Sequence, residues 1–86
     1  MIYAKNISDK VVKVAISNWS GEEDDDEYVD INTGEVVQWD RVDRRGFLMS
    51  VVFEGEAPML YSIRLNSYMT IDYNNIKNNG ERISPL

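Results

Sequence analysis

One segment of the sequence, residues 34–55, constrains the possible folds of this chain more than any other. It is the most apolar stretch and reads GEVVQWDRVDRRGFLMSVVFEG. From Phe47 to Phe53, the odd-numbered residues lie on one face of an extended strand and the even-numbered residues lie on the other. Both faces are largely apolar, so we expect a central strand that is covered on both sides.

The first half of the same segment predicts a partner for this strand. Residues 36–41 alternate in polarity, which places Trp39 on the inward face. The link over residues 42–46 is polar and ends in glycine, as hairpin loops commonly do. We therefore expect a β-hairpin that has Trp39 and the two phenylalanines in the core and exposes Arg44 and Arg45 at its tip.

The rest of the chain consists of short alternating stretches without a helical period. Turn signals recur about every 8–12 residues, which is typical of a β-sandwich or barrel. The prediction is a single all-β domain over residues 1–86, an antiparallel β-sandwich or barrel of about six to eight short strands. The expected strands cover residues 2–7, 10–19, 28–31, 36–41, 47–54, 59–65, 68–73 and 82–84.

Local spacing also predicts how some of these strands pair and which side chains they bury. The link Ser8-Asp9 is short, so the first two strands are expected to form a hairpin. A turn at Gly80 is expected to bring the tail back as a last edge strand. The inward residues predicted by the period of two are Val12, Val14, Ile16, Val29, Ile31, Met59, Tyr61, Ile63, Leu65, Met69, Ile71 and Tyr73.

The composition excludes most enzyme chemistries. The 86 residues include neither cysteine nor histidine, so thiolate metal sites and nucleophile–histidine arrangements are impossible. Asp40 and Asp43 are three residues apart at the end of an expected strand, where their carboxylates would face opposite sides. We expect a non-enzymatic protein without a cofactor.

The net charge of −6 argues against nucleic-acid binding by bulk electrostatics. Six of the acids are consecutive, over residues 22–27. One interpretation is a solvated loop that keeps the protein soluble. The other is a calcium site that includes Asp24, Asp26 and Asp30, although Val29 stands where an EF-hand loop needs glycine.

Three arginines stand out in this acidic chain: Arg41, Arg44 and Arg45. Guanidinium groups bind carboxylate and phosphate groups in a bidentate manner. Together with Trp19, whose indole could stack on a sugar ring or insert at a lipid interface, they form a candidate ligand site. The alternative is that the arginines pair with nearby acids and that Trp19 only covers the end of the sandwich.

The first ten residues lack the apolar run of a secretory signal, and no stretch approaches membrane-spanning length. We expect a soluble, leaderless, cytoplasmic protein, with leaderless release as an alternative.

Several sequence strings are similar to those of a known group of proteins. A KNIS start, VAISNWSG, DINTGEVVQWDR, GFLMSVVF and NNGERISPL follow one another in an order that resembles the aegerolysin and actinoporin-like β-sandwich proteins. The resemblance implies a leaderless sandwich that acts on membrane lipids or sugars through aromatic residues and loops at one end. The amphipathic N-terminal helix of the actinoporins is missing here, which argues against pore formation.

These observations favour a non-enzymatic binding module for a glycan or a lipid headgroup, with peripheral membrane contact possible. The alternative is an acidic interaction protein of the inhibitor or immunity type, or a self-assembling structural protein. The acidic run would then engage a basic partner, or edge strands would drive formation of a homo-oligomer.

Overall fold

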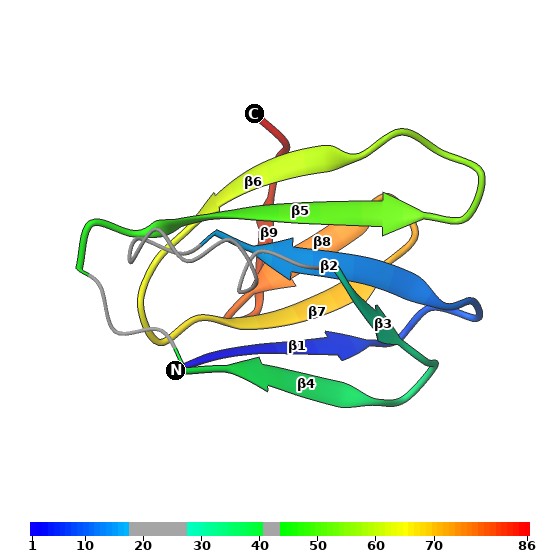
Figure 1. The fold of residues 1–86 in the computed structure, drawn as a ribbon, viewed down its shortest axis with the longest axis horizontal. Coiled ribbons are helices and arrows are strands. Elements are labelled where there is room, and N and C mark those ends of the chain that lie inside the picture. Colours follow the sequence, from blue (N-terminus) through cyan, green and yellow to red (C-terminus); the bar gives the residue numbers. More distant parts are fainter. Residues whose placement is uncertain (18–27, 41–43) are drawn as a thin grey trace.

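The structure, a computed structural model, describes residues 1–17, 28–40 and 44–86 and shows two β-sheets packed face to face (Figure 1). The predicted all-β sandwich is confirmed. Within this part of the chain, no helix has the length and hydropathy needed to cross a bilayer. The strands are β1 (Ile2–Asn6), β2 (Val12–Ile16), β3 (Val29–Ile31), β4 (Val36–Trp39), β5 (Phe47–Phe53), β6 (Met59–Ile63), β7 (Tyr68–Asp72), β8 (Asn75–Asn78) and β9 (Glu81–Ile83).

The two sheets divide the strands in an order that differs from their order in the sequence. The five-stranded sheet runs β4-β1-β7-β8-β9, and the four-stranded sheet runs β3-β2-β5-β6. All neighbouring strands are antiparallel except β1 and β7, which are parallel and pair Tyr3 with Tyr68. The links β1–β2, β3–β4, β4–β5 and β6–β7 therefore cross from one sheet to the other.

The core lies between the two sheets, because each strand turns one apolar face inward. The inward sets expected for β2 and β5 are confirmed: Val12, Val14, Ile16, Met49 and Val51 are all fully buried. The three large aromatic side chains expected in the core are buried too, with Trp39 at 8%, Phe47 at 4% and Phe53 at 5% exposure.

Both predicted hairpins are wrong. β1 does not pair with β2, and β4 does not pair with β5, because each pair is divided between the two sheets. A short polar link can join two strands in different sheets as well as two strands of one hairpin. The length of a link alone therefore does not predict which strands pair. Arg44 and Arg45 are nevertheless exposed, in the turn before β5.

Two predictions about burial are also corrected. β5 is central, but only one of its faces is covered: Leu48, on the other face, is 47% exposed. Tyr73 was expected inward, yet it is 56% exposed. β7 ends at Asp72, and Asn74 adopts a positive φ of 54° in the turn, so Tyr73 leaves the alternation.

The described residues form nine strands rather than six to eight, because the asparagine-rich tail forms two. Asparagine is disfavoured in strands, which concealed β8 in the sequence. Asn79 and Gly80, with φ values of 52° and 88°, connect β8 to β9. Two consecutive positive φ values are typical of the tight turn of a two-residue hairpin. The expected last edge strand is confirmed, one residue earlier than predicted.

Candidate functional site

The sandwich has two ends that differ in shape and charge. We call one the groove end; it holds residues 7–11 and 54–58, on the right in Figure 1. The other is the arginine end, which holds residues 44–46 and 64–67. The chain folds so that the β1–β2 corner and the β5–β6 turn meet at the first of these ends.

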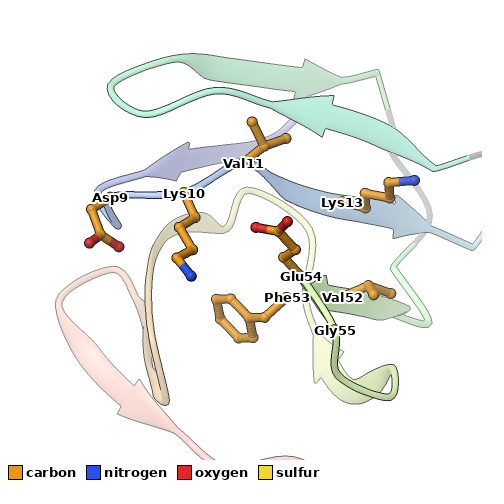
Figure 2. A pocket seen from close by; sticks show the side chains of 8 residues that line it. All are labelled: Asp9, Lys10, Val11, Lys13, Val52, Phe53, Glu54 and Gly55. Atoms are coloured by element: carbon orange, nitrogen blue, oxygen red, sulfur yellow. The ribbon is translucent and has the colours of Figure 1, made fainter.

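A surface groove of about 630 Å³ opens at the groove end. Figure 2 shows Lys10, Phe53 and Glu54 in its middle, with Asp9 and Lys13 at opposite margins. A second hollow of about 370 Å³ shares Asp9, Lys10, Phe53 and Glu54 with it and extends the groove to Tyr73. The full lining of the first hollow is Asp9, Lys10, Val11, Lys13, Val52, Phe53, Glu54 and Gly55.

The corner that carries Lys10 into the groove is fixed by one buried amide, that of Asn6. Its Nδ2 donates to the carbonyl oxygens of Lys10 at 2.6 Å and Ile31 at 2.8 Å. Its Oδ1 accepts from the amide of Ser8 at 2.9 Å and lies 2.6 Å from the Ser8 hydroxyl. Both donors and both lone pairs of Asn6 are therefore used, and the corner has one arrangement.

Two aromatic rings define the apolar part of the groove. Phe53 is a core residue at the end of β5, and the Tyr73 ring meets it edge to face, with ring centroids 5.5 Å apart and an interplanar angle of 69°. A hydrogen bond to Glu56, together with the negative charge of that carboxylate, raises the pKa of the exposed Tyr73 phenol.

The polar groups of the groove have mixed charge. Asp9, Glu54 and Glu56 supply carboxylates, and Lys10 and Lys13 supply amines. In the part of the chain that the structure describes, neither lysine forms an ion pair with Glu54. Amines and carboxylates that do not neutralise each other can donate to and accept from a polar ligand, while the aromatic rings offer a flat apolar contact.

At the arginine end, the structure brings Arg64 close to two of the predicted arginines, Arg44 and Arg45. Phe47 and Ile63 are register partners, so the turn before Phe47 and the turn after Ile63 lie side by side. The first carries Arg44 and Arg45 and the second carries Arg64, and all three are exposed. The Ser67 hydroxyl donates to the Arg64 carbonyl at 2.6 Å and holds this turn. Sequence spacing could not reveal Arg64, since it is distant from the other two in the chain.

Several predicted site residues lie outside the described residues: Trp19, Arg41, Asp24 and Asp26. Asp30, the remaining candidate calcium ligand, is exposed on β3 opposite Lys13. Among residues 1–17, 28–40 and 44–86, no three acidic side chains are grouped as a metal ion would require. The groove was not predicted from the sequence, although the Asn-Asn pair after Tyr73 is a turn signal that indicates an exposed ring.

No protein-family model, curated protein or solved structure matches this chain. The resemblance to aegerolysin and actinoporin-like proteins stays a prediction.

Proposed function

We propose that the protein is a non-enzymatic binding module for a glycan and that the groove between Lys10, Phe53, Glu54 and Tyr73 holds it. One observation supports this proposal above the others: an exposed tyrosine lies edge to face on a core phenylalanine, beside amines and carboxylates that form no ion pair with one another among the described residues. Sugar rings present an apolar C–H face and a rim of hydroxyl groups, which these two kinds of side chain complement.

The charge of the groove favours a glycan over an anionic lipid headgroup. Its three carboxylates outnumber its two lysines, so phosphate would meet a slightly negative surface. Hydroxyl groups, in contrast, accept from amines and donate to carboxylates without a charge penalty. The rigid corner around Asn6 supports the same function, because preorganised side chains lose less entropy when a ligand binds.

The test is binding to a panel of immobilised neutral and acidic oligosaccharides, with Tyr73→Ala and Glu54→Gln as the groove variants. We expect each change to lower affinity for the retained sugar by about tenfold or more. Tyr68→Ala is the matched control, because Tyr68 is also an exposed tyrosine (39%) but lies on the five-stranded sheet. Its affinity should equal that of the parent protein.

The headgroup alternative is tested with vesicles of phosphatidylcholine, with and without phosphatidylserine. The decisive result would be binding to anionic vesicles that is lost in Arg44→Ala/Arg45→Ala and kept in Tyr73→Ala. The ligand site would then be at the arginine end. That result would contradict the groove proposal and support the site predicted from the sequence. Such binding should also weaken with salt, because exposed charges are screened.

A further inference from the structure

We propose that β4 is an interaction edge at which two copies of this chain pair antiparallel, so that their five-stranded sheets become continuous. Figure 1 shows β4 at the margin of its sheet, next to β1 alone. This interface is separate from the groove and independent of the glycan proposal.

The first observation is which backbone groups of β4 lack partners among residues 1–17, 28–40 and 44–86. The amide of Tyr3 donates toward β7, to a carbonyl at 3.0 Å, so the odd-numbered residues of β1 face that strand. The even-numbered residues of β1 face β4, where their register partners are Val37 and Trp39. Val36 and Gln38 alternate with Val37 and Trp39 along β4. Their N–H and C=O groups therefore point to the opposite side, away from the sheet.

The second observation is a contrast among the four edge strands of the described residues. β9 carries Glu81 and Arg82, and β3 carries Asp30 in its centre. β6 is partly covered, because the amide of Leu86 donates to the Leu60 carbonyl at 2.8 Å. Charges and covering segments are the usual protection of an edge against pairing. β4, with the sequence VVQW, has neither within its bounds.

The third observation is that β4 complements itself. In an antiparallel pair whose two-fold axis passes through Val37, Val36 of one copy faces Gln38 of the other, and both carry the outward-pointing groups. The half-buried Val37 meets its own equivalent on the inner face. The flanking acids Glu35 and Asp40 fall opposite Trp39 and Gly34, so no like charges face each other. A short edge of this kind makes a weak interface.

The test is sedimentation velocity from about 10 µM to about 1 mM, a range suited to small, transient interfaces. We expect the mass to rise toward that of a dimer with concentration. Val36→Lys should raise the dissociation constant at least tenfold, because lysine on an edge opposes pairing. Leu48→Lys is the matched control, since Leu48 is 47% and Val36 is 49% exposed, and it should dimerise as the parent does.

Hydrogen exchange supplies a second readout that locates the interface. The amides of Val36 and Gln38 should exchange fast at low concentration and more slowly at high concentration, whereas the amide of Val37 should be protected at both. A parent protein that stays monomeric at the highest concentration overturns the proposal. So does equal loss of dimer in both lysine variants, or a dimer that leaves the Val36 and Gln38 amides unprotected.

Discussion

Two corners of the sandwich, one at each end, are held by buried polar side chains in different ways. At the groove end, every donor and acceptor of Asn6 has a partner within the β1–β2 corner and β3. At the arginine end, Nδ2 of Asn78 donates to the Ser67 hydroxyl at 3.1 Å, while its buried Oδ1 has no partner in the part of the chain that the structure describes. An unpaired buried acceptor costs stability, whereas a saturated network fixes a single geometry.

The two corners therefore differ in how completely the hydrogen-bonding groups of their amide side chains are satisfied. The saturated amide lies behind the groove and fixes the backbone that carries Lys10. The under-satisfied amide stands behind the β6–β7 turn, which Ser67 also ties to Arg64 through its own hydroxyl. The geometry of the corner at the groove end therefore depends on one side chain. The geometry of the corner at the arginine end depends on several.

The largest expected effect follows from Asn6→Ala. The change removes the bonds of Asn6 to the Ile31 carbonyl and the Ser8 amide and leaves the Lys10 carbonyl with the Ser8 hydroxyl, so the free energy of unfolding should fall by about 2–4 kcal/mol. Urea denaturation of the variant and the parent measures it. Sugar binding at the groove should weaken as well. A midpoint within error of the parent would show that water replaces the amide and that the corner is not fixed by Asn6.

A smaller difference is expected between two glycines, one at each end. Gly46 has a φ of +89°, and a Cβ there would lie 2.9 Å from the carbonyl oxygen of Ile63; Gly55 has a φ of +77° and open space. Gly46→Ala should therefore cost about 2–3 kcal/mol and Gly55→Ala about 1 kcal/mol. Thermal unfolding of both variants checks this order. Equal losses would mean that the turn before β5 relaxes away from β6.

The smallest effect is expected for Asn78→Ala. The variant loses one hydrogen bond to Ser67 but also removes the unpaired oxygen, so stability should change by less than about 1 kcal/mol. The same urea experiment, run beside Asn6→Ala, gives the direct comparison. A loss as large as that of Asn6→Ala would remove the distinction between the two corners.

The sequence predicted the elements of the fold better than their arrangement. The period of two in β2 and β5 is imposed by burial of one face, so it could be read directly from Val12, Val14, Met49 and Val51. The assignment of neighbouring strands to different sheets could not be read. It depends on bonds such as that from Asn6 to Ile31, which lies 25 residues further along the chain.

The candidate site was predictable in part for the same reason. Exposure of Arg44 and Arg45 follows from local polarity. The groove does not, because Lys10, Phe53 and Tyr73 come from three places in the chain and meet only after the sheets have packed. The period of two alone places Tyr73 in the core. Only the turn signal of the two asparagines after it, seen in the structure as the positive φ of Asn74, indicates that this ring leaves the alternation.

The parallel pairing of β1 with β7 has a consequence for how the protein is made. Tyr3 meets Tyr68 in this register, so the first strand cannot complete its place in the five-stranded sheet until β7 has left the ribosome. At about 5–20 residues per second, synthesis of the intervening chain takes several seconds. During that interval β1 has only β4 to pair with, and formation of the five-stranded sheet is delayed until most of the chain has emerged.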